Sequence, residues 1–240
     1  MNTADNHAAT PSLCWNCNAQ LESPYCCDRC VKIQPWPDAA DFFTFLGLPR
    51  RLRIDQAGLE ERFLKLSRMF HPDFFQDSIT PERDISLVNA ARLNKAYCTL
   101  KDPTARAEYI LELELGTRRK PSKTVPPHIA AQVMELQELL FAFAALSDDN
   151  PARIARKTEL AERHAAIVQQ DAETLADLDR LFAEYDLVMD EATSPFEPAA
   201  RRKIESILTR IDQTLAARLY LKRIEDNVAA VLEGKDANPL

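Results

Sequence analysis

The chain has 240 residues, of which 46% are hydrophobic and 28% are charged, and its formal net charge is −7. Only four glycines are present, too few for a glycine-rich nucleotide site or for many tight β-hairpins. The acidic balance argues against a domain that follows a nucleic-acid backbone by charge. The composition therefore favours a mainly α-helical protein with no nucleic-acid partner.

The N-terminal residues predict no export or membrane insertion. Residues 1–13 lack the basic and apolar stretches of a signal peptide, and residues 1–11 are polar enough to be disordered. The longest uninterrupted apolar run, 139–146, is far too short to span a membrane. We therefore expect a cytoplasmic protein with reduced thiols and no membrane partner.

Residues 12–35 form a cysteine-rich segment with two C-x-x-C pairs separated by nine residues. Two such pairs can direct four thiolates at one centre, the cage that structural zinc prefers. The segment is too short to bury a core of its own, so a metal would have to supply its folding energy. We predict one structural zinc ion held by Cys14, Cys17, Cys27 and Cys30.

The alternatives for these cysteines are disulfides, a redox pair, or iron in the same cage. Disulfides suit a secreted chain, which this sequence does not indicate. Cys26 could compete with Cys27 as a ligand, but its spacing to Cys30 is one residue longer, so we treat Cys26 as the spare. Cys98 lies in an apolar helical stretch and is interpreted as a small core residue.

Helical signals repeat over residues 41–117. Asp55 can cap a helix that ends at Pro72, because proline cannot continue a helix. Thr80 is expected to cap the next helix, with Pro81 in its first turn. The segment therefore predicts a helical hairpin.

The tripeptide His71-Pro72-Asp73 lies at the connection of this hairpin. By itself it indicates only a helix stop and a turn. Its position between two helices makes it more specific, because proline would hold a histidine and an aspartate on a stiff corner. The preceding helix also carries a basic set beside the corner, which could equally be an ordinary solvated face: Arg62, Lys65 and Arg68.

This arrangement resembles a J-domain, and the match narrows to one family. Residues 41–49, 71–75, 93–100 and 103–111 resemble the HscB family, the J-domain co-chaperones of iron–sulfur cluster assembly. Residues 14–17 resemble the tetracysteine module that some members carry. The resemblance is close over 14–116 and loose over 127–235.

The resemblance implies a co-chaperone rather than an enzyme. Members recruit an IscU-type scaffold protein to a DnaK- or HscA-type chaperone and stimulate its ATPase. His71, Pro72 and Asp73 would then contact the chaperone, and the basic set would steer it toward the corner. The alternative is a generic J-domain co-chaperone with another client.

Residues 118–126 are expected to form a linker, and residues 127–235 a C-terminal antiparallel bundle of three or four helices. The helices are predicted near 127–146, 151–170, 172–192 and 198–233. The first has two apolar stripes at helical spacing. One is Ile129, Val133, Leu136, Leu140 and Phe143, and the other is Ala130, Met134, Phe141 and Ala145. The second stripe is either buried in the bundle or exposed to a partner.

In the family, the first long helix and an aromatic residue of the last helix bind the scaffold. The family pattern stands here at 134–138. The resemblance therefore implies a scaffold-binding set of Ala131, Met134, Glu135, Glu138 and Tyr220, to which the second apolar stripe adds Phe141. The positions that follow Glu138 are apolar here and often acidic in the family.

Overall fold

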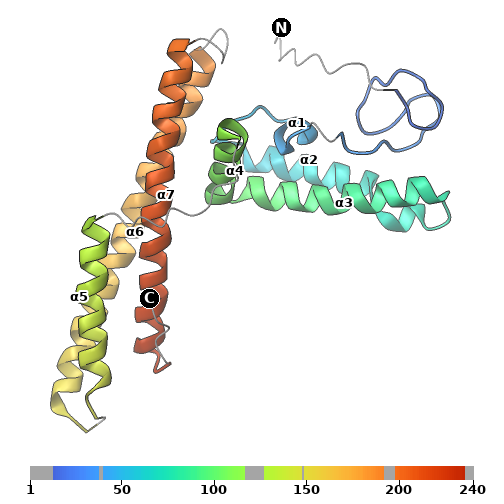
Figure 1. Ribbon diagram of the computed structural model, residues 1–240. Helices are drawn as coiled ribbons and strands as arrows, with labels where there is room; N and C mark the ends of the chain where they lie inside the picture. Colours follow the sequence, from blue (N-terminus) through green and yellow to red (C-terminus); the bar gives the residue numbers. More distant parts are fainter. Residues whose placement is uncertain (1–12, 38–39, 117–126, 148, 192–197, 236–240) are drawn as a thin grey trace. The chain divides into compact units, whose positions relative to one another are not determined.

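The computed structural model describes residues 13–37, 40–116, 127–147, 149–191 and 198–235 (Figure 1). The described residues form seven α-helices and one short 3-10 helix, which confirms the mainly α prediction. The chain divides into two compact units: the first reaches Arg50 and resumes over Ile54–Arg106, and the second comprises Arg51–Arg53 and the residues from Ala107 onward. The segments expected to be disordered (1–11) and to form a linker (118–126) lie outside the described residues.

The first unit contains the cysteine-rich segment and a helical hairpin. Its elements are α1 (Phe42–Leu46), α2 (Gln56–Met69), η1 (Pro72–Phe75), α3 (Thr80–Lys101) and the start of α4 (Pro103–Leu115). Helices α2 and α3 pack against each other, and α1 packs against both. The Asp55 carboxylate accepts from the amides of Ala57 and Gly58, so it caps α2 as predicted.

Two local predictions for α3 are wrong. Thr80 is its first residue rather than its cap; Ile79 occupies the cap position without a side-chain hydrogen bond. Cys98 is exposed rather than part of the core. Helix α3 buries Leu93 and Leu100 on its inner face, and Cys98 falls outside that face because helical side chains advance by about 100° per residue.

The second unit is a bundle of α5 (Pro127–Ala144), α6 (Pro151–Glu191) and α7 (Pro198–Leu232). Helices α6 and α7 lie side by side, and α5 packs against both (Figure 1). None of the helices in the described ranges combines the length and the apolar character needed to cross a membrane.

The expected break of α6 near residue 171 is absent, so the described bundle has three helices and not four. No proline or glycine interrupts 152–191. Asp171 lies toward the bundle and accepts a hydrogen bond from Nε of Arg218 on α7 at 2.9 Å. Helix α6 therefore continues through Asp171, which is paired with Arg218, at the position where the sequence predicts a boundary between two helices.

The bundle core is apolar and continuous. Its members come from all three helices: Ile129, Leu136, Leu139, Leu140, Phe143, Leu160, Leu221, Ile224 and Val228. The first predicted stripe of α5 supplies four of them, and its fifth residue, Val133, is partly buried against the same cluster. Each buried side chain of this kind contributes roughly 1.5–3 kcal/mol relative to leaving it exposed.

Candidate metal centre and partner-binding surfaces

The two C-x-x-C pairs form two equivalent turns. In each turn the amide of the first cysteine donates to a carbonyl five residues later, and an amide four residues later donates back to the first cysteine. The bonds are Cys14 N to Ala19 O (2.8 Å), Asn18 N to Cys14 O (3.0 Å), Cys27 N to Lys32 O (2.9 Å) and Val31 N to Cys27 O (2.8 Å). The backbone thus presents each pair of thiols in the same way.

The residue after each pair adopts a left-handed backbone conformation, with φ of 53° at Asn18 and 57° at Val31. Asparagine tolerates this region because its short polar side chain can hydrogen-bond locally. Most other residues with a side chain lose roughly 1–2 kcal/mol there, and a β-branched residue such as valine is a genuine outlier. Such a conformation persists only where the surrounding structure determines it. The geometry of the cysteine turns therefore outweighs the preference of Val31 for a negative φ.

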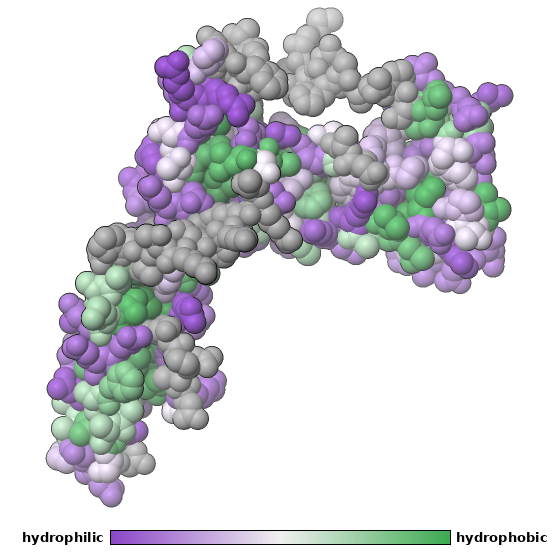
Figure 2. All heavy atoms as spheres, in the orientation of Figure 1, coloured by the Kyte–Doolittle hydropathy of each residue, from purple (hydrophilic) through white to green (hydrophobic). Residues whose placement is uncertain are grey.

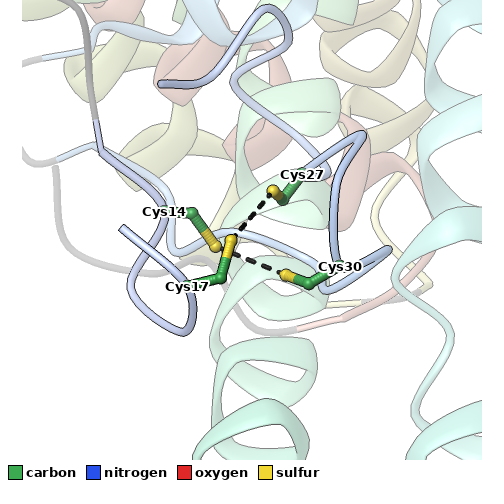
Figure 3. Close-up of side chains that lie close together, drawn as sticks. All are labelled: Cys14, Cys17, Cys27 and Cys30. Carbon is green, nitrogen blue, oxygen red and sulfur yellow. Dashed lines mark hydrogen bonds between the residues drawn. The ribbon is translucent and has the colours of Figure 1, made fainter. Parts of the chain in front are cut away.

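The four thiols converge on one point (Figure 3). The sulfur atoms of Cys14 and Cys30 are 3.5 Å apart, those of Cys17 and Cys27 are 3.7 Å apart, and all four lie within 4.8 Å of one another. A tetrahedral zinc site with Zn–S bonds of about 2.3 Å has sulfurs about 3.8 Å apart, whereas a disulfide requires about 2.0 Å. The cage therefore fits one metal ion with four protein ligands and no open position.

The electrostatics of the cage also fit a cation. Burial raises the pKa of Cys14, but the amides of Cys17 and Asn16 outweigh it and lower that pKa to about 6. The Ala19 amide lowers the pKa of Cys17, but burial and the neighbouring sulfurs raise it to about 11. Neighbouring thiolates repel one another, so a divalent ion is needed to hold all four ionised.

Cys26 lies outside the cage. Its backbone pairs with Ile33 in an isolated bridge, just as Leu13 pairs with Gln20 in the first turn. Its sulfur contacts the Cys27 carbonyl oxygen at 3.9 Å and does not join the group of four. Within the described residues, the structure therefore keeps Cys26 as the spare, as its spacing predicts.

The His71-Pro72-Asp73 corner is exposed. The side chain of His71 is 49% accessible and that of Asp73 is 71% accessible. His71 Nδ1 accepts from the Asp73 amide at 3.3 Å and lies 3.6 Å from the Asp73 carboxylate. Pro72 opens the 3-10 helix η1, in which the Phe74 amide donates to the His71 carbonyl at 3.1 Å. Both polar side chains thus project from a hydrogen-bonded corner.

The three basic residues of α2 have different environments. Lys65 and Arg68 are exposed. The Arg62 guanidinium donates to the carbonyl oxygens of Leu46 and Gly47, at 3.1 and 2.7 Å. It thus provides hydrogen-bond donors for carbonyl groups at the C-terminal end of α1. Arg62 therefore has a structural contact that the sequence pattern does not show.

The second apolar stripe of α5 is exposed, which decides between the two predicted alternatives. Met134 is 64% accessible and Phe141 is 77% accessible. Figure 2 shows apolar side chains at the surface of the region that carries α5. Exposed side chains of this size within one stripe suit a partner surface.

The other predicted scaffold residues lie in three settings. Glu135 and Glu138 line a groove of about 360 Å³ between α5 and α6, where Arg163 lies 3.9 Å from Glu135. Ala131 is exposed on α5. Tyr220 is partly buried against the apolar core of the bundle. The structure thus separates the carboxylates, which face the groove, from the exposed Met134–Phe141 stripe.

The sequence pattern does not reveal that the cysteine segment packs against the hairpin. The Trp36 amide donates to the Asn89 side chain of α3 at 2.9 Å, and Asn89 donates to the Gln34 carbonyl at 2.8 Å. The Trp36 ring stacks on Phe45 of α1. These partners are polar or aromatic residues far apart in the chain, and no local pattern in the sequence pairs them with one another.

Several known proteins are similar to this chain in sequence and in fold, although no protein-family model matches it. The chain is 28% identical over 166 residues to the human iron–sulfur cluster co-chaperone protein HscB, covering 66% of this chain and 71% of the human protein. It is 39% identical over 129 residues to a co-chaperone HscB homolog of Aliivibrio salmonicida, covering 50% and 75%. The crystal structure of human HscB matches with a TM-score of 0.67 and 22% identity, over 92% of this chain and 98% of that chain.

Proposed function

The chain belongs to the HscB family of co-chaperones, and from this premise we propose that it delivers an IscU-type iron–sulfur scaffold to a DnaK- or HscA-type chaperone and stimulates that chaperone's ATPase. The observation that carries the proposal is the exposed His71-Pro72-Asp73 corner. No catalytic step is assigned to the chain itself, whose role is to bring two partners together.

The corner suits recognition of an arginine on the chaperone. The Asp73 carboxylate is exposed and can accept a bidentate pair from a guanidinium. Nδ1 of His71 already accepts from the Asp73 amide, which leaves its other ring nitrogen for the partner. Lys65 and Arg68 add positive charge next to this corner in sequence, and such charge acts mainly on the encounter rate with an acidic surface.

The scaffold surface is the exposed stripe of α5. Met134 and Phe141 present apolar side chains, and Glu135 and Glu138 present carboxylates on the groove side. An interface of this kind needs a few apolar anchors and charges that select the partner. The cysteine cage would hold one structural zinc ion, which contributes folding energy rather than chemistry.

Two variants test the two surfaces separately. Asp73→Asn keeps the shape of the corner but removes its charge, so we expect it to abolish ATPase stimulation and leave scaffold affinity unchanged.

Replacing both Met134 and Phe141 with serine should weaken scaffold binding about tenfold or more, because each substitution removes one apolar anchor. Stimulation of the chaperone ATPase in the absence of scaffold should persist.

The measurements are steady-state ATPase assays and scaffold-binding titrations by calorimetry. Full stimulation by folded Asp73→Asn protein would refute the chaperone assignment. Normal stimulation together with no scaffold binding by the wild-type chain would favour the generic J-domain co-chaperone with another client.

A further inference from the structure

We propose that the metal-holding segment positions the chaperone-binding corner, because it contacts both ends of residues 70–82. The inference rests on the proposed function for its meaning, but its structural part can be tested without any partner. The positioning residues are Tyr25 and Lys32, which flank the second cysteine pair in sequence.

Tyr25 holds the first end of this stretch. Its ring lies 6.4 Å from the ring of Phe70, centroid to centroid, and Phe70 immediately precedes His71. It also meets Phe45 edge to face, with centroids 5.4 Å apart and planes at 87°. The Tyr25 hydroxyl donates to the Phe45 carbonyl oxygen. An aromatic contact anchored by a hydrogen bond has a defined orientation, so Tyr25 restrains the fully buried Phe70 from the side of the metal.

Lys32 holds the second end. Its ammonium lies 2.5 Å from the Glu82 carboxylate, in the first turn of α3, and the Glu82 side chain is only 4% accessible. A carboxylate buried to this degree needs its partner, because an unpaired charge there is strongly unfavourable. Ser86, one turn further along α3, donates to the Phe70 carbonyl at 2.9 Å and ties the two ends together.

The metal would control these two contacts through the second cysteine turn. Tyr25 is two residues before Cys27, and Lys32 is two residues after Cys30. The Lys32 carbonyl closes the turn by accepting from the Cys27 amide, and the Gln34 amide donates to the Tyr25 carbonyl at 2.9 Å. Without the ion, the turn has too small a core to hold its shape, so both contacts would loosen together.

The corner at residues 71–73 is held by short-range bonds: the Asp73 amide donates to His71 Nδ1 at 3.3 Å, and the Phe74 amide donates to the His71 carbonyl at 3.1 Å. Such a short segment depends on restraints at its ends to keep one conformation. The metal segment would therefore act on chaperone docking without touching the chaperone.

Hydrogen exchange of the full chain, measured by mass spectrometry on peptides spanning 70–82, tests this inference. We expect Lys32→Met to speed exchange in these peptides about tenfold, since it removes a hydrogen bond to a buried charge. Lys32→Arg should restore slow exchange. Lys95→Met, which removes an exposed lysine from α3, the helix that carries Glu82, is the matched control and should have no effect. Stripping the metal with a chelator should match or exceed the effect of Lys32→Met.

The outcomes separate three cases. Faster exchange confined to 70–82 supports positioning of the corner. Unchanged exchange in both Lys32→Met and the metal-free protein overturns the inference. Faster exchange throughout α2 and α3 also overturns it, because the metal segment would then support the whole unit and not the corner in particular.

A parallel ATPase titration links the result to the chaperone. The Lys32→Met protein should need several-fold more co-chaperone for half-maximal stimulation while reaching the same maximal rate, since docking is weakened and the acidic corner is intact. If the wild-type chain fails to stimulate any chaperone, the proposed function fails, yet the exchange result still decides the positioning of the corner.

Discussion

Each of the two units of this chain is stabilised internally in a different way. In the first, a buried ion pair and an asparagine link the cysteine-rich segment to a helical hairpin, beside buried apolar side chains such as Phe45, Phe70 and Leu93. In the second, three helices close on a continuous apolar cluster. Specific polar contacts depend on their partners individually, whereas an apolar core distributes its stability over many side chains.

This difference also distinguishes the two candidate sites. The corner at residues 71–73 belongs to the unit in which contacts link distant segments, so we expect substitutions far from it in sequence to alter it. The exposed stripe of α5, the candidate scaffold surface, lies on a helix whose opposite face is packed in the core, so substitutions in it should change stability little. Both tryptophans, Trp15 and Trp36, belong to the first unit, so their fluorescence reports on it alone.

The largest expected effect concerns the apolar core of the bundle. Leu160 is fully buried, and Leu160→Ala should lower the free energy of unfolding of the second unit by about 4 kcal/mol, because it leaves a cavity. Phe141→Ala, on the exposed stripe, should change it by no more than about 0.5 kcal/mol. Denaturant unfolding followed by far-UV circular dichroism measures both. A shift in the tryptophan fluorescence transition of Leu160→Ala would break the comparison, since it would couple the units.

The next effect concerns the buried pair of Asp171 and Arg218, which is the polar exception within the second unit. Arg218→Met should cost about 3 kcal/mol, because it leaves a carboxylate that is 12% accessible without its cation. Arg201→Met removes one partner of an exposed pair with Glu205 and should cost at most about 0.5 kcal/mol. Equal losses for the two variants in chemical denaturation would contradict the difference we assign to burial.

The smallest effect is pH-dependent and belongs to the first unit. Burial raises the pKa of Asp41, but the Thr44 amide and the Arg50 guanidinium outweigh it, so the folded pKa is lowered. The stabilisation is therefore present above the unfolded pKa of about 3.9 and is lost as the pH falls through the folded value. Asp41→Ala should cost about 1 kcal/mol at pH 7, the typical value of a helix cap.

The same variant should approach wild-type stability as the pH falls from the unfolded pKa of about 3.9 through the lower folded pKa, because protonation of the wild-type carboxylate removes its stabilising contacts. Tryptophan fluorescence during urea unfolding at several pH values provides the measurement. A constant difference between the two proteins from pH 7 to pH 3 would exclude Asp41 as the source of the acid sensitivity.

Local patterns were sufficient for the cage and for the position of the corner. Cysteine spacing of the C-x-x-C type dictates which thiols converge, and the four that the structure brings together are the four predicted. Asp55 caps α2 as predicted, and Pro72 starts a new turn. Thr80 and Cys98 were misplaced because a cap and a buried face each depend on neighbours outside the local window.

The amino-acid sequence by itself determined the cysteine ligands, the helical hairpin and the stiff corner, since each follows from residues a few positions apart. Only the tertiary structure decided that α6 continues through Asp171, that Met134 and Phe141 face outward, and that the cysteine-rich segment contacts both ends of residues 70–82. The physical reason is that these features depend on contacts such as Lys32 with Glu82 and Arg218 with Asp171, across 50 and 47 positions of the chain. A charged residue carries no local signal for a partner so distant, because only packing brings the two together and makes their burial tolerable.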